Sequence, residues 1–377
     1  MPGRLPRRRR SRAEDLKIVS YVTPLHFDPS SYLGGGERYP LNLAKAVSST
    51  GDYEVEIVSY GDGSRLETRR LADGVTLRIL PTSARTSTGD RLSWDIIPAV
   101  RDVDLVHIHQ IFSRSSEVAM LAAKVLGKPV CVTDHGGASS LLGSSHGILD
   151  LADRIVCYSS FGGSLLETRK PVDVVPGGVD DGFFTPPKAD GPRDRVLYVG
   201  RLLPHKGVDR LLTALPDGVK LCVCGRAYHD EYFQLLQALA AGKQVEFLVG
   251  ADDDALRDLY RQAIAVVLPS VYVDCYGSTQ PWPELMGFSL LEGMACGAPA
   301  ICSRVGGMPE YVDHGQTGFV FDELAELRHY IDRLASDSEL VQSLGAQAQQ
   351  RVRQDFGLAS AGSSMRAIYD DLLATTP

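Results

Sequence analysis

The 377-residue chain has few of the features that mark secreted or membrane-spanning proteins. Its seven cysteines form no Cys-x-x-Cys pair and lie mostly in apolar runs, which indicates buried thiols in a reducing cytosol rather than disulfides or a zinc site. No stretch reaches the roughly 18 apolar residues that a membrane span requires. We therefore expect a cytoplasmic globular protein, with attachment to the inner membrane surface as the alternative.

Acidic residues outnumber basic ones outside the amino terminus. Six arginines and no acidic residue lie in the first twelve positions, and the formal net charge of −8 becomes −14 without them. An acidic body of this kind argues against nucleic acid as a partner. We interpret residues 1–15 as a disordered extension, because the run lacks the apolar face of an interfacial helix. Contact with a phosphate-bearing surface is the alternative, and the polar residues that follow exclude a secretory signal peptide.

Several nucleotide- and metal-binding signatures are also missing. The glycines at 34–36 lack the Gly-x-Gly-x-x-Gly spacing of dinucleotide-binding dehydrogenases. Neither Gly-Lys pair, at 127–128 or 242–243, is followed by the Ser or Thr of a P-loop. The acidic run 252–254 opens a predicted helix and is interpreted as its cap. We therefore expect no metal site and no cofactor.

What the sequence does contain is a regular alternation of short β-branched runs with longer helical patterns. This alternation predicts an α/β protein with parallel sheets covered by helices. Strands are predicted at 16–23, 53–60, 75–80, 104–109, 130–134 and 154–158, and again at 196–199, 220–224, 245–249, 263–268 and 300–303. Helices are predicted at 208–215, 229–241, 253–261, 284–296, 324–335, 339–356 and 359–374.

The restart of this pattern at Arg195 predicts two Rossmann-like domains that face each other across a cleft. A segment rich in proline, glycine and aspartate separates them. We place the N-terminal domain at 16–176, the linker at 177–194 and the C-terminal domain at 195–356. The last helix, 357–377, is predicted to pack back on the N-terminal domain.

Charged residues follow the strands of the second predicted domain. Arg201 and Lys206 lie five residues apart on one loop, where the pair can neutralise a diphosphate. Glu284 and Glu292 stand eight positions apart, the second inside a helix that begins near 287–288. Both carboxylates can accept hydrogen bonds from sugar hydroxyls. Taken alone, two basic residues on a loop are more often solvated than catalytic. The glutamates alone are also compatible with one helix-capping and one exposed residue.

Three motifs together resemble one enzyme family. The Gly-Arg-x4-Lys-Gly loop at 200–207, the glutamates with seven residues between them and the Gly-Gly-Met-Pro-Glu segment at 306–310 are similar to the retaining nucleotide-sugar glycosyltransferases of family 4, which have the GT-B fold. The resemblance covers nearly the whole chain from Leu16 onward. It implies an N-terminal domain for the acceptor and a C-terminal domain for a nucleoside diphosphate sugar, the co-substrate of a hexosyltransferase-type enzyme. Because Arg201 and Lys206 can take the role of a metal ion, we expect the enzyme to be metal-independent.

The resemblance also implies roles for the matching positions of this chain. Donor-binding side chains are expected at four positions: Arg201 and Lys206 for the diphosphate, Glu292 for the ribose hydroxyls and Glu284 for the transferred sugar. Backbone N–H groups are expected to contact the donor at Gly35, Gly36, Phe288, Ser289 and Leu290. Arg201, Lys206 and Glu284, together with one histidine, are the candidate catalytic residues.

That histidine lies on a predicted strand of the first domain. Strand alternation puts His107 and His109 on the same side at the cleft edge. The family often has a histidine near the donor sugar at the position of His109, which is our candidate. The alternative is that His107 packs in the core and His109 borders a loop. His135 and Gly136 resemble the family's Thr-x-His-Gly segment and are candidates for contacting the acceptor or the sugar.

These observations predict transfer of a sugar to an acceptor. No matched carboxylate is an obvious nucleophile, so we favour front-face attack, in which a donor phosphate oxygen takes the acceptor proton. A small metabolite or natural-product scaffold is the favoured acceptor, and a membrane lipid or polysaccharide is the alternative. A sugar-nucleotide epimerase and a non-catalytic nucleotide-sugar binder are the rival functions. Residues 271–283 depart from the usual family pattern and leave the donor sugar open.

Overall fold

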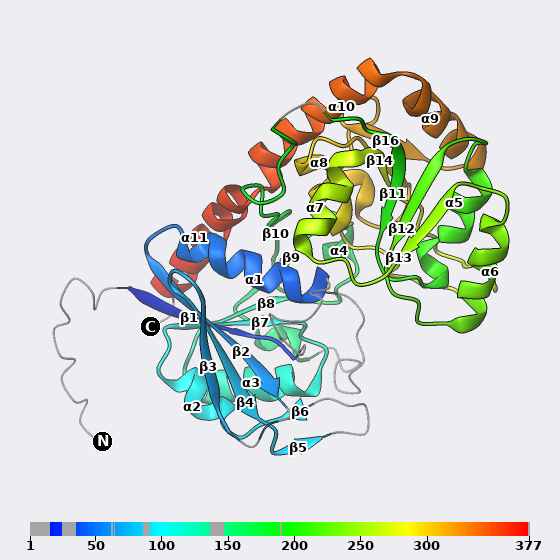
Figure 1. Ribbon diagram of the computed structural model, residues 1–377. Helices are drawn as coiled ribbons and strands as arrows, with labels where there is room; N and C mark the ends of the chain where they lie inside the picture. Colours follow the sequence, from blue (N-terminus) through cyan, green and yellow to red (C-terminus); the bar gives the residue numbers. More distant parts are fainter. Residues whose placement is uncertain are drawn as a thin grey trace, which may run out of the picture.

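The computed structural model describes residues 16–24, 35–61, 63, 65–85, 91–135, 147–188 and 191–375. Within these ranges the chain forms two α/β domains, each built around its own sheet (Figure 1). The predicted class, two Rossmann-like domains with parallel sheets, is confirmed. The arginine-rich segment 1–15 and Gly136 lie outside the described residues. Across the described ranges, no helix combines the length and apolar character needed to traverse a bilayer.

The first domain has an eight-stranded sheet in the order β10-β9-β8-β7-β1-β2-β4-β3. Its strands are β1 (Lys17–Val22), β2 (Tyr53–Gly61), β3 (Glu67–Ala72), β4 (Val75–Pro81), β7 (Leu105–His109), β8 (Val130–Thr133), β9 (Arg154–Cys157) and β10 (Val172–Val174). Its helices are α1 (Gly35–Ser48), α2 (Ile96–Arg101), α3 (Arg114–Val125) and α4 (Ser160–Ser164), and β5 (Ala84–Arg85) pairs with β6 (Arg91–Leu92) in a separate ribbon.

The second domain has a six-stranded parallel sheet in the order β13-β12-β11-β14-β15-β16. Its strands are β11 (Arg195–Val199), β12 (Lys220–Cys224), β13 (Val245–Leu248), β14 (Ala263–Leu268), β15 (Ala300–Ser303) and β16 (Gly318–Phe321). Its helices are α5 (Val208–Ala214), α6 (Asp230–Ala240), α7 (Asp253–Gln262), α8 (Phe288–Ala295), α9 (Leu324–Ser336) and α10 (Ser338–Arg351).

Burial explains why the central strands are nearly continuous apolar runs. Every residue of β7, β8 and β14 is buried, because helices cover both faces of a parallel sheet. The strand order reverses between β1 and β7 in the first domain and between β11 and β14 in the second. Ligands of such folds bind beyond the carboxyl ends of the strands at these reversal points. The loops after β7, β11 and β14 therefore define where a site is expected.

The structure differs from the sequence-based prediction in a few elements. Strands β3, β10 and β16 were not predicted. Strand β3 is an exposed charged edge, and β10 has only three residues. The helix given the range 284–296 begins at Phe288, close to the start near 287–288 expected from its motif, since Gly287 has a φ of 87° that ends the preceding loop. The predicted helix 339–356 is α-helical to Arg351 and continues as a π-helix through Phe356.

The last helix, α11 (Leu358–Thr375), leaves the second domain and lies along α1 of the first (Figure 1). The two helices approach closely at Gly362, where a Cβ atom would lie 2.5 Å from the Ala46 carbonyl oxygen. Tyr369 reaches the first domain's core, where its hydroxyl contacts the Tyr21 hydroxyl at 2.8 Å and a ring nitrogen of His107. The end of the chain is therefore part of the N-terminal domain's core.

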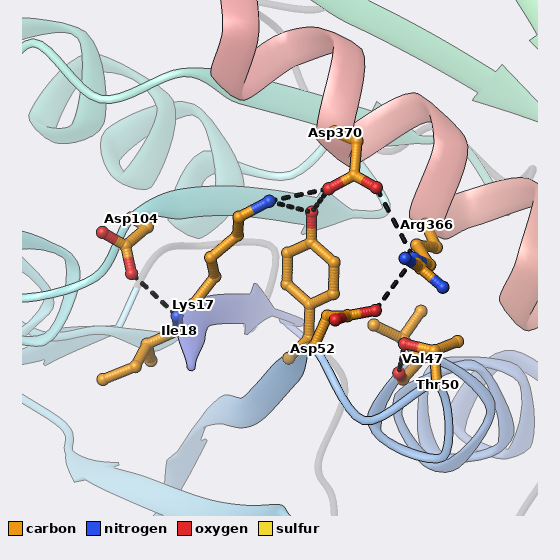
Figure 2. A network of polar contacts seen from close by, with 9 residues as sticks. Lys17, Ile18, Val47, Thr50, Asp52, Asp104, Arg366 and Asp370 are labelled. Carbon is orange, nitrogen blue, oxygen red and sulfur yellow. Dashed lines mark hydrogen bonds and ion pairs between the residues drawn. The ribbon is translucent and has the colours of Figure 1, made fainter. Parts of the chain in front are cut away.

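A polar network connects α11 to the amino-terminal ends of β1 and β2 in the same domain (Figure 2). Asp370 accepts from Lys17 Nζ and from the Tyr53 hydroxyl, both at 2.7 Å. One turn earlier, Arg366 pairs with Asp52 at 2.9 Å. The hydrogen bond from Lys17 lowers the pKa of the Asp370 carboxyl below its ordinary value.

Replacing Asp370 by asparagine is expected to lower the free energy of unfolding at pH 7 by about 1 kcal/mol or less, since the carboxylate is 41% exposed. A carboxylate with a depressed folded pKa contributes stability above its unfolded pKa of about 3.9 and loses it as the pH falls through the folded value. Urea unfolding at pH 7 and at pH 3 should show the difference only at pH 7. Asp332→Asn, an exposed position on α9, is the control and should change stability at neither pH.

Candidate active site

The loops after β11 and β14 bring Lys206 and Glu284 together. Lys206 Nζ lies 2.5 Å from Glu284 Oε2 and donates to the Pro283 carbonyl at 3.2 Å. Both side chains are mostly buried, at 13% and 16% exposed. Two of the candidate catalytic residues therefore form one ion pair, although 78 positions separate them in the chain.

The glycines of the Gly-Gly-Met-Pro-Glu segment pack against the backbone of Glu284. Gly306 has a φ of 61°, and a Cβ atom there would lie 1.9 Å from the Glu284 carbonyl oxygen. The next residue, Gly307, donates its N–H to that carbonyl at 3.1 Å. Only residues without a side chain permit this approach, so the segment fixes the backbone position from which the Glu284 carboxylate projects.

Arg201 adds a second positive charge to the Lys206 loop, and His205 lies between the two in the sequence. Arg201 is exposed, and no ion-pair partner for it occurs among the described residues. Burial, followed by the positive charges of Lys206 and Arg201, lowers the pKa of His205 to about 4. Two positive charges therefore remain close together without a matching number of acids, which suits a ligand with two negative charges.

The N-terminus of α8 lies next to Glu284. Its first turn contains the three predicted N–H donors, and the Leu290 N–H already bonds to the Gly287 carbonyl at 2.9 Å. The N–H groups of Phe288 and Ser289 precede the first intrahelical bonds, and their partial positive charge favours an anion. Gly35 and Gly36, predicted to approach the donor from the other domain, are the first two residues of α1.

Glu292 is buried on α8 and meets a side chain from the other domain. Its Oε1 lies 3.3 Å from Arg38 Nε, and its Oε2 accepts from the Tyr260 hydroxyl at 2.7 Å. Arg38, on α1, also forms two parallel hydrogen bonds with Asp253 at 2.6 and 3.0 Å. Burial raises the pKa of Glu292, and the charge of Arg38 opposes that shift. A cation of the first domain thus compensates the carboxylate predicted to bind ribose.

The histidines of the first domain form a buried aromatic cluster. His107 bonds through Nδ1 to Tyr369 and through Nε2 to Thr133, at 2.5 and 2.8 Å, so both of its ring nitrogens are used within the core. His109 stacks on it with ring centres 4.2 Å apart and bonds through Nδ1 to His135 Nε2 at 3.1 Å. Both His107 and His109 are fully buried.

Residues 271–283, which depart from the family pattern, are anchored by two hydrogen bonds, one to the Lys206 loop and one to Gly306. The Val271 N–H donates to the His205 carbonyl at 2.9 Å, and the Tyr272 hydroxyl accepts from the Gly306 N–H at 3.0 Å. Tyr276 and Trp282 are exposed on its outer side, at 53% and 42%. The segment therefore exposes two aromatic side chains.

The two domains also contact each other through the Gly-Gly-Met-Pro-Glu segment. Both carboxylate oxygens of Glu310 accept backbone N–H groups at the start of α4, those of Ser160 and Phe161, at 2.8 Å. The Ser159 hydroxyl donates to the Leu285 carbonyl at 2.7 Å. These bonds connect the first domain to Glu310 and to Leu285, the residue after Glu284.

Both halves of the chain match known families. Residues 33–183 match the family described as Glycosyltransferase Family 4, and residues 182–351 match that described as Glycosyl transferases group 1. The chain belongs to the family 4-type GT-B glycosyltransferases. The predicted family and the predicted glycosyltransferase activity are therefore confirmed.

Individual proteins agree with this membership. A D-inositol 3-phosphate glycosyltransferase of Mycobacterium sp. (strain KMS) is 28% identical over 370 residues, covering 84% of this chain and 81% of its own. The sucrose-phosphate synthase of Thermosynechococcus elongatus superposes with a TM-score of 0.73 at 21% identity, covering 95% and 99% of the two chains. HepE of Anabaena has the same TM-score at 18% identity, covering 94% and 100%. The two structures support the GT-B fold.

The structure of this glycosyltransferase also reveals residues that the sequence did not indicate. Arg38, Asp253 and Tyr260 converge on Glu292, and Tyr158 bonds to His135. Arg38, in the first turn of α1, belongs to no recognisable motif, and its partner Glu292 lies 254 positions away in the sequence. Only the position of Arg38, two residues after Gly36, was a signal that could have placed it at the cleft.

Proposed function

We propose that the protein transfers a sugar from a nucleoside diphosphate sugar to a hydroxyl of a small soluble acceptor, with retention of anomeric configuration. The observation that carries the proposal is the Lys206–Glu284 pair beside the N-terminus of α8. There, Lys206, Arg201 and the first N–H groups of the helix can receive a diphosphate. Glu284 and Glu292 supply acceptors for the hydroxyls of the sugar and the ribose.

The names of related proteins support the choice of donor and acceptor. HepE was crystallised with UDP and glucose, and also with UDP-glucose. The mycobacterial relative is named for a small, soluble, phosphorylated polyol acceptor. A uridine-containing donor and a polar small molecule as acceptor are accordingly the first combination to test.

The chemistry follows from where charge develops. As the bond from the sugar to the diphosphate breaks, negative charge grows on the leaving group, and the cations and helix N–H groups stabilise it more than they stabilise the intact donor. No carboxylate in the site is assigned as a nucleophile. We therefore favour attack from the face of the leaving group, with a donor phosphate oxygen taking the acceptor proton. Arg201 and Lys206 provide positive charge, and the proposal requires no metal.

The test is a panel of UDP-, GDP- and ADP-sugars with polyol phosphate, glycoside and lipid acceptors, measured by release of the nucleoside diphosphate and by product mass. One donor should give acceptor-dependent release that persists in EDTA, and NMR should show the donor's anomeric configuration in the product. Inverted product would contradict retention, loss of activity in EDTA would contradict metal independence, and tight binding without release would favour a non-catalytic binder.

A further inference from the structure

Three aromatic residues lie at or just beyond the carboxyl ends of three neighbouring strands in the first sheet. His109 is the last residue of β7, His135 lies two residues beyond β8, and Tyr158 is the first residue after β9. His109 Nδ1 lies 3.1 Å from His135 Nε2, and His135 Nδ1 is in hydrogen-bond contact with the Tyr158 hydroxyl. The three side chains therefore form a continuous hydrogen-bonded chain across the sheet edge.

The direction of this chain is set at its tyrosine end. A phenol is both donor and acceptor, and no other hydrogen-bond partner of the Tyr158 hydroxyl occurs among the described residues. Because a buried O–H without an acceptor is unfavourable, the phenol donates to His135 Nδ1. His135 then carries its proton on Nε2 and donates to His109 Nδ1, so the proton of His109 lies on Nε2.

Burial keeps these histidines neutral, so that a tautomer is the relevant property. Burial lowers the pKa of His135 to about 3, and burial together with the neighbouring rings holds the pKa of His109 well below its usual value. His109 Nε2 is buried and has no hydrogen-bond partner among the described residues. It is thus an unpaired N–H donor in the cluster at the end of β7.

We infer that Tyr158 and His135 are positioning residues that fix the tautomer of His109, so that its Nε2–H is available to donate to an oxygen of the bound sugar. The contact with the sugar rests on the proposed function, whereas the tautomer of His109 does not. Both ring nitrogens of His135 are already used, so the His135 side chain acts through His109 rather than by its own hydrogen bond to substrate.

Contacts from both domains hold these three side chains in place. The Tyr158 carbonyl accepts from the Tyr311 hydroxyl of the second domain, and the Tyr158 ring packs edge-on against Tyr39 with ring centres 4.5 Å apart. The His135 N–H donates to the Gln110 side-chain oxygen at 3.1 Å, and Gln110 has a φ of 64°. A non-glycine residue rarely adopts that conformation, which is strained and persists where surrounding contacts enforce it.

The direct test reads the tautomer without substrate. Long-range proton–nitrogen NMR spectra of protein labelled with ¹⁵N-histidine distinguish the protonated from the unprotonated ring nitrogen, and His109→Gln assigns the signals. In the wild type we expect His109 to be protonated on Nε2 at pH 7. In Tyr158→Phe, which keeps the ring but removes the donor, the His109 signals should shift toward a mixture of tautomers. A wild-type His109 protonated on Nδ1 would overturn the inference.

Kinetics test whether this tautomer matters to the reaction. Tyr158→Phe should lower kcat/KM for the donor about three- to tenfold, the value of one neutral hydrogen bond. The temperature of thermal unfolding should be unchanged or slightly lower. Tyr369→Phe is the matched control, because it removes a buried phenol from His107 instead. It should leave the His109 signals unchanged and lower kcat/KM less than Tyr158→Phe does.

The outcomes separate the two proposals. A changed tautomer with unchanged kcat/KM would overturn the positioning role while leaving glycosyl transfer intact. An equal kinetic loss in Tyr369→Phe with no tautomer change in Tyr158→Phe would show a packing effect and overturn it as well. Absence of transfer by the wild type would count against the proposed function, and the NMR spectra would still decide the tautomer.

Discussion

Replacing Arg38 by glutamine is expected to lower the free energy of unfolding by about 3–5 kcal/mol at pH 7, the usual cost of breaking a buried ion pair from one side. The Arg38 and Glu292 side chains are only 9% and 5% exposed. Without Arg38, no cation among the described residues contacts Glu292, and one hydrogen bond from Tyr260 remains. Urea unfolding should record the loss as a lower midpoint.

A double-mutant cycle identifies Glu292 as the source of the cost. Glu292→Gln removes the buried charge, so Arg38→Gln should cost much less in that background. Asp253→Asn removes Arg38's other partner, whose carboxylate is 47% exposed, and should cost about 1 kcal/mol or less. Additive effects of Arg38→Gln and Glu292→Gln, or an equal loss in Asp253→Asn, would contradict this explanation.

The pH dependence of Arg38→Gln provides a second check. Burial already raises the pKa of Glu292 in the wild type, and removing Arg38 raises it further. A carboxylate with a folded pKa above its unfolded value of about 4.3 destabilises the fold at higher pH. The penalty disappears as the pH falls through the folded pKa toward the unfolded one. The variant should therefore be closest to the wild type near pH 4 and furthest from it at pH 7 and above.

The fold was largely predictable because its signals are local and repeated. Strands such as β7 and β14 are buried on both faces, so their apolar runs are visible in the sequence. The errors fell where that signal fails. The exposed strand β3 has charged residues, and the segment before α8 looks helical until Gly287 ends it with a positive φ.

The site was predictable only where a motif carries it. Lys206 and Glu284 belong to spaced motifs, and the structure places them in one ion pair. Arg38 and Tyr158 act through side chains on other strands and helices, and pairing over such distances has no local pattern. Their roles depend on sheet order and on how the domains meet, which single-sequence reasoning does not reach.

Replacing Lys206 by alanine is expected to lower kcat/KM for the donor about 100- to 1,000-fold, the usual loss when one preorganised charge or donor at a developing anion is removed. Lys206→Arg keeps the charge but not the compact ammonium beside Glu284, and should recover only part of the loss. The measurement is nucleoside diphosphate release under kcat/KM conditions. The matched control is Lys124→Ala, which breaks the 2.8 Å pair with Asp153. That pair lies at the amino-terminal end of β9, opposite the strand ends that face the site, so kcat/KM should be unchanged.

A structural role for Lys206 makes a different prediction. Removing Lys206 alone leaves Glu284 without its cation, so part of any loss could come from a displaced carboxylate. Lys206→Met combined with Glu284→Gln removes both charges and should restore much of the stability lost in Lys206→Met. If Lys206 serves the leaving diphosphate, activity stays low in the double variant, because neutralising Glu284 does not replace the missing charge. Recovery of activity together with stability would instead show that Lys206 acts only by holding Glu284.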